Sequence, residues 1–429
     1  MKKYSKRIFL AMLFVLSIIA LVGCGGNKEK DILQINKEKI AKAQKMNEKE
    51  LAAAAKEEIG DNIFMFKSQT SSAKYSIAKF SEKYGINYDK EFSSKSNKDT
   101  DTYAALDRVA GGDYYADVLI VQEVKTVLQY MDQEILLNFV PKDIVGLKDE
   151  DKYPLAALYI NKLFLWNKKN IEDPNFFTNV WQLAGSKEER QANPDRYIAK
   201  SSFQSSTQEK INAGFLMSLT SPESVAKLKD AYQKFYGKAY VDEPQYKNIG
   251  YKYLTEYLSN ITTWHSSDTT AVTETLVQDT ANPRTVFYAS FTKHKGLSSQ
   301  LAPKDESFGT KEERAAEGVR LANEILSYDI KLEGFNGYLY KMFTVIPKTS
   351  KYCYTACLFA RYMLTEEAFN AGFQGYYAYY SPIETIPQAA GDLPLAEWKR
   401  RNIVENQAYL KTTDYALKEL IDNLNKSSK

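Results

Sequence analysis

Histidine and cysteine are scarce in this chain. Among 429 residues there are two histidines and three cysteines, which leaves little material for histidine-dependent catalysis, a cysteine-based zinc site or a disulfide framework. The sequence also lacks the H-E-x-x-H, G-x-S-x-G, G-x-G-x-x-G and P-loop patterns. We therefore expect no enzyme, no metal and no cofactor. The 54 acidic residues leave one alternative open, an exported hydrolase such as a glycoside hydrolase.

A strong excess of charge is absent as well. The whole chain has 57 basic and 54 acidic residues, and residues 1–23 hold four of the basic ones and no acidic one. The remainder therefore carries 53 basic against 54 acidic side chains. Such a balance does not predict a nucleic-acid footprint, so we expect no nucleic acid among the partners.

A long apolar run occurs at the N-terminus. The start, residues 1–7, is basic, and the run Ile8–Val22 is apolar except for Ser17. This run is shorter than the roughly twenty residues of a membrane-spanning helix, so it predicts a cleaved export signal over residues 1–23. The sequence Leu21-Val22-Gly23-Cys24 resembles the lipobox of bacterial lipoproteins. The resemblance implies lipidation of Cys24 and a membrane anchor on the outer side of the cytoplasmic membrane. The alternative is a simple secretory signal followed by a chance cysteine.

The other two cysteines, Cys353 and Cys357, are four residues apart in a segment with helical periodicity. At this spacing the Cβ atoms are about 5–6 Å apart, so a disulfide would be strained. We expect two buried thiols.

Apolar runs and helical patterns alternate along the rest of the chain. The runs at residues 63–66, 116–121, 155–164 and 285–290 predict buried strands, and amphipathic segments between them predict helices. This alternation predicts an α/β fold with mainly parallel sheets flanked by helices. A chain of this length commonly divides into two lobes. We place the crossings at residues 155–164 and 338–346.

These crossings define the expected domains. Residues 24–60 form a charged stretch to about Lys49, expected as a solvated tether or a loosely packed helix, and a short N-terminal helix that ends at Gly60. Residues 61–156 plus 340–429 form lobe 1, and residues 157–339 form lobe 2. Two helix starts carry capping signals. Ser72 precedes one helix, and Ser206 with Glu209 three residues later predicts a capping box at another.

Polar residues follow the predicted strands in both lobes. In open α/β sheets, ligands bind beyond the carboxyl ends of the strands. We therefore predict ligand-binding roles for two hydroxyl-rich and amide-rich segments, for the end of one strand and for a tyrosine-rich run. These candidates are Ser68, Gln69, Thr70, Ser71, Gln122, Ser201, Ser202, Gln204, Ser205, Tyr376 and Tyr377. The alternative is that the serines only cap helices and that the tyrosines, among 31 in the chain, only pack.

Several short stretches occur in an order that suggests a family. They are Glu48–Leu51, Phe80–Ile86, Gly111–Asp113, Ala116–Val118, Ile346–Ser350 and Met363–Ala368. Together with the lipobox, they resemble the type II extracellular solute-binding proteins of ABC importers, in the group that binds iron(III), polyamines or sugars. The resemblance covers residues 50–425.

The resemblance implies a monomer whose two lobes close around a small polar solute and deliver it to an ABC transporter permease. Iron binders of this group hold the metal with tyrosine phenolates, sometimes with a histidine. The tyrosine pairs of this chain, with His265 and His294, lack the context that marks those binders. The chemical class of the solute stays open, as does a receptor role coupled to a membrane sensor.

Overall fold

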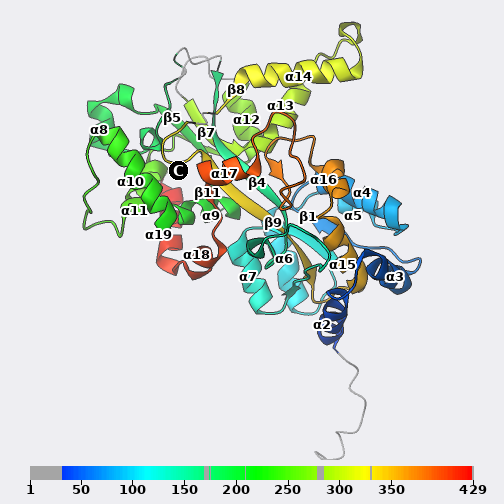
Figure 1. Ribbon diagram of the computed structural model, residues 1–429. Helices are drawn as coiled ribbons and strands as arrows, with labels where there is room; N and C mark the ends of the chain where they lie inside the picture. Colours follow the sequence, from blue (N-terminus) through cyan, green and yellow to red (C-terminus); the bar gives the residue numbers. More distant parts are fainter. Residues whose placement is uncertain are drawn as a thin grey trace, which may run out of the picture.

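The computed structural model describes residues 31–168, 173, 175–207, 209–277, 285–328 and 331–427. The predicted signal and Cys24 lie outside this part of the chain. Helices and short strands alternate as the sequence predicts, and they form two lobes (Figure 1). The strands are β1 (Phe66–Ser68), β2 (Val118–Gln122), β3 (Leu136–Leu137), β4 (Ala156–Asn167), β5 (Lys200–Gln204), β6 (Thr263–His265), β7 (Thr285–Ser290), β8 (Leu326–Ser327), β9 (Gly337–Pro347), β10 (Tyr379–Tyr380) and β11 (Ile403–Val404).

The helices surround the strands of each lobe. Around the first lobe lie α2 (Ile32–Ala43), α3 (Glu48–Ile59), α4 (Ala73–Tyr84), α5 (Lys90–Ser94), α6 (Asp99–Ala110), α7 (Val124–Asp132), α15 (Cys353–Tyr362) and α16 (Glu366–Gly372). Around the second lie α8 (Lys187–Ala192), α9 (Lys210–Ser218), α10 (Pro222–Tyr236), α11 (Ile249–Ser259), α12 (Asp268–Val277), α13 (His294–Leu301) and α14 (Lys311–Ile325). The C-terminal segment adds α17 (Leu395–Arg401), α18 (Gln407–Thr412) and α19 (Tyr415–Ser427).

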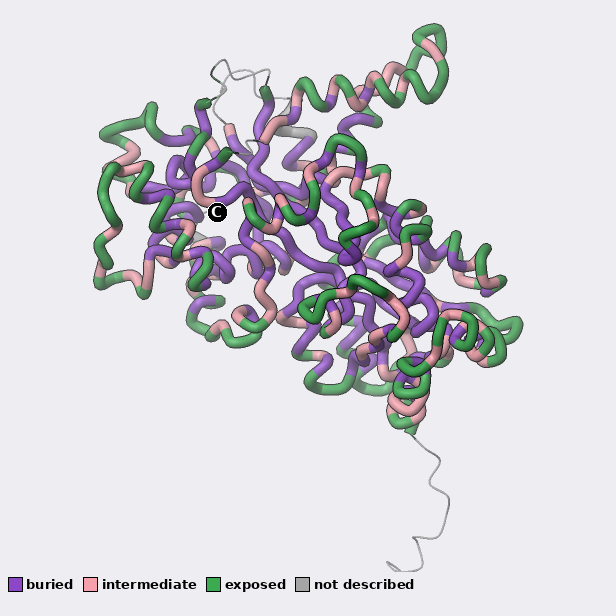
Figure 2. The backbone as a smooth tube through the Cα atoms, viewed as in Figure 1, coloured by how far each residue is buried: buried purple, intermediate pink, exposed green. Residues whose placement is uncertain are grey.

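One sheet runs through both lobes, in the strand order β1-β2-β9-β4-β7-β5-β6. The outer strands pair in parallel, β1 with β2 on one side and β5 with both β6 and β7 on the other. The two long strands β4 and β9 pair with each other in an antiparallel way at the centre. The buried part of the backbone follows this sheet from one lobe to the other (Figure 2). The α/β fold predicted from the sequence is therefore confirmed.

The long strands β4 and β9 are the crossings that the sequence predicts at residues 155–164 and 338–346. All residues of both strands are buried, which agrees with their mostly apolar sequences. In its first half β4 pairs with β9 and, at Tyr159 and Ile160, with β10, whereas Lys162 to Leu165 pair with β7 of the second lobe. Both strands therefore connect the lobes, and we call this pair the hinge strands.

The first strand is shorter than predicted and begins later. The sequence predicts a strand at residues 63–66, but β1 begins at Phe66. The reason is Asp117, whose side-chain Oδ2 accepts a hydrogen bond from Met65 N at 2.9 Å. Phe64 makes only an isolated bridge, with Tyr88.

Two features depart from the sequence prediction near the ends of the chain. Residues 32–43, expected as a solvated tether or a loosely packed helix, form helix α2, which is closely packed on α15. Asn36 is fully buried there and donates to the carbonyl oxygens of Lys348 and Ser350 at 3.0 and 2.8 Å. At the other end, α19 packs on α9 and α11, which belong to the part expected as lobe 2. The boundaries of the lobes along the chain stay a proposal.

Both predicted helix caps are wrong in detail. Ser72 occupies the N-cap position of α4 without a side-chain cap bond. The capping box of Ser206 and Glu209 does not form, because α9 begins only at Lys210. Instead, Ser206 Oγ accepts a hydrogen bond from Asn425 Nδ2 of α19 at 2.5 Å, and the Glu209 carboxylate points to Lys162. The predicted buried thiols are confirmed, since Cys353 and Cys357 are free and buried in α15.

Candidate ligand-binding site

Two of the predicted glutamines meet at the carboxyl ends of β1 and β2. Gln69 Nε2 and Gln122 Nε2 both donate to Oδ1 of Asp99, at 2.7 and 3.0 Å. Gln122 N donates in turn to Gln69 Oε1 at 2.7 Å. Asp99 is the first residue of α6 and is 5% exposed. The first lobe thus presents a carboxylate held by two amide side chains.

The second lobe presents a buried ion-pair network around Lys162. This lysine lies on β4 and is completely buried. Its Nζ donates to Asn212 Oδ1 at 2.9 Å and lies 3.1 Å from Asp268 Oδ1 and 3.2 Å from Glu209 Oε1. The other oxygen of Asp268 accepts from Ser290 N at 3.1 Å. A buried lysine requires such partners, because an uncompensated charge in the interior is costly.

The two networks touch each other. Lys210 N, at the start of α9, donates to Asp99 Oδ2 at 2.8 Å. The ammonium group of Lys210 lies 3.9 Å from the ring centroid of Tyr103, on α6. These contacts join the two lobes on one face of the hinge strands. We call the joined set the interlobe cluster; it consists of Gln69, Asp99, Gln122, Lys162, Glu209, Lys210 and Asp268.

The interlobe cluster contains three carboxylates and two lysines. Burial raises the pKa of Asp99. Burial, with the charges of Asp268 and Asp99, raises the pKa of Glu209 to about 7 against the opposing effect of Lys162. Burial by itself would lower the pKa of Lys162, but Asp268 and Glu209 outweigh it and raise that pKa. The cluster therefore carries little net charge at neutral pH, and it is rich in oxygen atoms that can accept hydrogen bonds.

The other candidates of the first lobe lie beside this cluster. Thr70 Oγ1 shares a hydrogen bond of 2.7 Å with the hydroxyl of Tyr379, on β10. Ser68 Oγ accepts from Thr70 N at 3.0 Å and so shapes the turn. Ser71 is exposed and follows directly. Thr70 and Tyr379 thus place two further hydroxyls near the ends of β1 and β10.

The structure separates the four candidates of the second lobe. Gln204 joins the site, since its carbonyl oxygen accepts from Asn212 Nδ2, a side chain that also binds Lys162, at 2.9 Å. Ser205 follows it and shares a hydrogen bond of 2.8 Å with Thr207. Ser201 lies near the start of β5, where its Oγ donates to Asn260 O at 3.0 Å. Ser201 and its buried neighbour Ser202 belong to the body of the strand.

The two candidate tyrosines differ. Tyr377 packs on Phe291 and His294, with ring centroids 5.5 and 4.6 Å apart. Tyr376 lies 5.9 Å from the ring of Tyr379, so of the two it is the nearer to the site. In the described part of the chain, no three His, Cys, Asp or Glu side chains are grouped to hold a metal ion.

Sequence reasoning missed the charged members of the site. Lys162 carries the clearest signal, because it is a lysine inside a mostly apolar strand, and buried lysines need ionic partners. Asp99 and Asp268 each begin a helix, where a carboxylate is stabilised by the helix dipole. Nothing in the sequence indicates that these two residues come together around one hinge.

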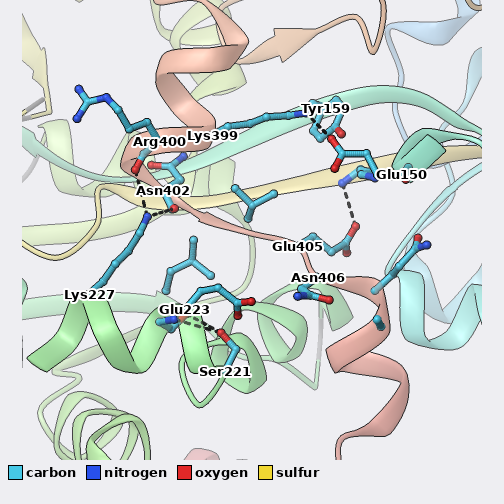
Figure 3. A pocket seen from close by; sticks show the side chains of 16 residues that line it. Glu150, Tyr159, Ser221, Glu223, Lys227, Lys399, Arg400, Asn402, Glu405 and Asn406 are labelled. Carbon is cyan, nitrogen blue, oxygen red and sulfur yellow. Dashed lines mark hydrogen bonds and ion pairs between the residues drawn. The ribbon is translucent and has the colours of Figure 1, made fainter. Parts of the chain in front are cut away.

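A separate cavity of about 540 Å³ lies on the other face of the hinge strands. It is lined by residues of α10, α17, β11 and α18, by Tyr159 of β4, by Lys341 of β9 and by Glu150 (Figure 3). Tyr159 and Lys341 are paired neighbours on β4 and β9. Side chains alternate along a strand, so they face away from Lys162 and Tyr340. We call this cavity the hinge-back pocket. It holds none of the predicted candidates.

Solved structures share this fold. An iron- and citrate-bound protein of Trichodesmium, IdiA or FutA, is 13% identical with a TM-score of 0.55, covering 84% of this chain and 98% of its own. The ferric binding protein of Campylobacter jejuni has the same identity and TM-score, over 84% and 99%. The glucopine complex of the PBP MotA from A. tumefaciens B6 is 12% identical with a TM-score of 0.53, over 85% and 99%. Neither a family model nor a curated protein sequence matches the chain. The chain therefore has the two-lobed, periplasmic-binding-protein-like α/β fold.

Proposed function

We propose that this chain is the substrate-binding component of an ABC importer, which captures a small polar solute between its lobes and delivers it to a permease. The observation that carries the proposal is the meeting of polar groups from both lobes at Asp99, beyond the carboxyl ends of β1, β2 and β5. Ligands bind at this position in open α/β sheets. The fold shared with solute-binding proteins such as MotA supports the same role.

The polar groups of the interlobe cluster limit the chemical class of the solute. Its carboxylates and amide oxygens are hydrogen-bond acceptors, and the ammonium groups of both of its lysines already have partners within the protein. A solute that donates hydrogen bonds, such as a polyol or an amine, suits this inventory better than an anion does. Gln69, Gln122, Thr70, Ser71, Gln204, Ser205 and Tyr376 would supply neutral contacts around the charged groups.

We propose further that the mature chain begins at Cys24 and acts as a monomer, anchored by lipid on the outer side of the cytoplasmic membrane. The basic start, the apolar run and the lipobox-like sequence support the anchor. In the described residues, the structure contains no helix long and apolar enough to cross a membrane. Mass spectrometry of the membrane-extracted protein tests the anchor, because lipidation adds acyl chains to the peptide that begins at Cys24.

A thermal-shift screen tests the solute-binding role. Purified residues 25–429 are mixed with polyols, sugars, amines, amino acids, carboxylates and ferric chelates. A solute at one hundred times its Kd adds about 2.7 kcal/mol of stability, which raises the melting temperature by a readable amount. A saturable shift with one class, larger for donors of hydrogen bonds than for anions, supports the proposal. Turnover of a compound without any saturable shift would contradict it in favour of an exported hydrolase.

A further inference from the structure

Tyr340, on the hinge strand β9, lies on the same face of the sheet as the interlobe cluster. It pairs with Ile160 of β4, and Ile160 pairs on its other side with Tyr379 of β10. Residues directly opposite each other on antiparallel strands point to the same face of a sheet. Tyr340, Ile160 and Tyr379 therefore form one row across the hinge. Lys162 lies two positions further along β4, so its side chain is on this face as well.

The phenol of Tyr340 is surrounded by carboxylates of both lobes. Burial raises its pKa well above the ordinary value, and the charges of Glu209, Asp268 and Asp99 raise that pKa further. Glu209 and Asp268 lie in the second lobe and Asp99 in the first. The phenol therefore stays protonated at neutral pH, and its hydroxyl can donate a hydrogen bond. A ferric ion would need the phenolate form, which these surroundings disfavour.

The hydroxyl of Tyr340 is left without a partner in the protein. Among the described residues, none makes a hydrogen bond to it, although the Tyr340 side chain is only 3% exposed. An unpaired hydroxyl in the interior costs free energy. The ring is held in place by Tyr338, which stacks on it with ring centroids 6.0 Å apart. The hydroxyl is thus fixed in position and available to a group that enters between the lobes.

Further hydroxyls lie beside this row. Tyr379 and Thr70 share a hydrogen bond of 2.7 Å, and in the second lobe Ser290 Oγ and Thr292 Oγ1 share one of 2.8 Å. Burial raises the pKa of Tyr379 against the opposing effect of hydrogen bonds with Thr70, Ser72 and Thr292. The Tyr379 hydroxyl therefore joins the two pairs. Each hydroxyl both donates and accepts, so this set can reorient its hydrogen bonds around a solute.

The charges of the interlobe cluster are nearly balanced among themselves. Lys162 Nζ lies 3.1 Å from Asp268 Oδ1 and 3.2 Å from Glu209 Oε1. Asp99 accepts the backbone N–H of Lys210 from the other lobe. Glu209, with a pKa of about 7, is only partly ionised at neutral pH. A charged solute would bring an uncompensated charge into this buried site, whereas a neutral solute leaves the existing pairs intact.

We propose that the interlobe cluster selects a neutral solute with several hydroxyl groups, a monosaccharide or an alditol, and that Tyr340 is a specificity-determining residue for it. The inference rests on the proposed function and narrows its solute class, because it excludes amines as well as anions. The hydroxyl of Tyr340 exchanges a hydrogen bond with one hydroxyl of the solute. A site built to pair with a hydroxyl discriminates strongly against an analogue that lacks it, because the buried group of the protein is then left unpaired.

Paired solutes test the class. Residues 25–429 are screened by thermal shift and then titrated calorimetrically with neutral hexoses, pentoses, hexitols and myo-inositol. The charged counterparts are glucosamine, gluconate, putrescine and ferric citrate. We expect saturable binding of at least one neutral solute, and at least about tenfold weaker binding of every charged one, equivalent to about 1.4 kcal/mol or more. The monosaccharide and alditol members of the panel decide between the two forms of the neutral solute.

The variant Tyr340→Phe tests the residue, because it removes one hydroxyl and keeps the ring. We expect about tenfold weaker binding of the best neutral solute, equivalent to about 1.4 kcal/mol, and an unchanged melting temperature without solute. The monodeoxy form of the solute that lacks the contacted hydroxyl should bind both proteins equally, which a purely structural role of Tyr340 would not produce. The control is Tyr75→Phe, at a side chain that is 47% exposed, and its affinity should stay within about twofold.

The outcomes separate this inference from the proposed function. If a charged solute binds as tightly as every neutral one, or more tightly, the solute-binding role stands and the inference is wrong. If no class of solute binds, both are contradicted. Affinity within about twofold of the unchanged protein in Tyr340→Phe overturns the role of Tyr340. If this variant does not fold, the paired solutes on the unchanged protein still decide the class.

Discussion

At the residue scale, Lys162 is the side chain on which the candidate site depends. Replacing it with methionine keeps most of its volume but leaves Glu209 and Asp268 buried without their counter-ion. Breaking a buried ion pair from one side costs about 3–5 kcal/mol. We therefore expect Lys162→Met to lower the free energy of unfolding by this amount in urea denaturation.

The matched control for this prediction is Lys95→Met, because the Lys95 side chain is 75% exposed and reaches Glu91 only at 3.6 Å. Its effect should stay within about 0.5 kcal/mol. A loss below about 1 kcal/mol for Lys162→Met, on the scale of an exposed pair, would show that Lys162 is not held as described.

Glu209 makes the stability of the folded protein depend on pH. Its pKa is raised from 4.5 to about 7, so between these pH values the folded protein keeps a proton that the unfolded chain releases. Stability therefore falls as pH rises through this window. Each pKa unit corresponds to about 1.4 kcal/mol, so Glu209 contributes a fall of roughly 3 kcal/mol.

Replacing Glu209 with glutamine removes this contribution. Urea denaturation at pH 4.5, 5.5, 6.5 and 7.5 should show a smaller decline for Glu209→Gln than for the unchanged protein. Glu91→Gln is the control, because that side chain is 87% exposed. Parallel curves for Glu209→Gln and the unchanged protein would contradict the assigned environment.

The sequence predicted the neutral residues of the site better than the charged ones. Gln69 and Gln122 follow recognisable strands, so strand-end position was sufficient to find them. Asp99 and Glu209 could not be found in this way, because their role comes from the approach of α6 and α9, which are separated by about one hundred residues of chain. Ser201 and Ser202 were favoured by composition, but they lie within β5 rather than at its end, and their ligand-binding role stays a prediction.

At the element scale, α2 is held to the first lobe chiefly through Asn36 and its apolar neighbours. Removing a buried amide that satisfies two carbonyl oxygens costs about 1–3 kcal/mol. We expect Asn36→Ala to release α2 locally, so that amides of residues 32–43 exchange hydrogen faster while those of the sheet do not. The control is Gln34→Ala, an exposed position of the same helix. Equal exchange in both variants would contradict the packing described.

The ends of the helices show which features a local sequence pattern predicts and which features it does not. The helix that ends at Gly60 has its predicted C-cap, because a glycine stop depends only on local backbone conformation. The capping box at Ser206 fails for the opposite reason. The carboxylate of Glu209 pairs with Lys162, and the hydroxyl of Ser206 accepts a hydrogen bond from Asn425. Partners from distant segments therefore replace the local capping bonds. The charged composition of residues 32–43 likewise did not predict that α2 is buried, because its burial depends on packing against α15.

At the scale of the whole molecule, alternating apolar and amphipathic segments were sufficient for the α/β class and for both crossing strands. The path of the C-terminal segment was not predictable. Helix α19 returns to α9 and α11 of the second lobe, a contact that depends on the tertiary arrangement rather than on periodicity. The hinge-back pocket exists because α17, β11 and α18 pass between the lobes on this return.

The measurement that tests the account most directly is a calorimetric titration of the solute that gives the largest thermal shift. It compares the unchanged protein with Gln69→Ala/Gln122→Ala and with the control Gln34→Ala/Gln245→Ala, in which two exposed glutamines are replaced. The account predicts at least about tenfold weaker binding in the first variant, equivalent to 1.4 kcal/mol or more, and unchanged binding in the control. Equal affinity in all three proteins would show that the interlobe cluster does not hold the solute.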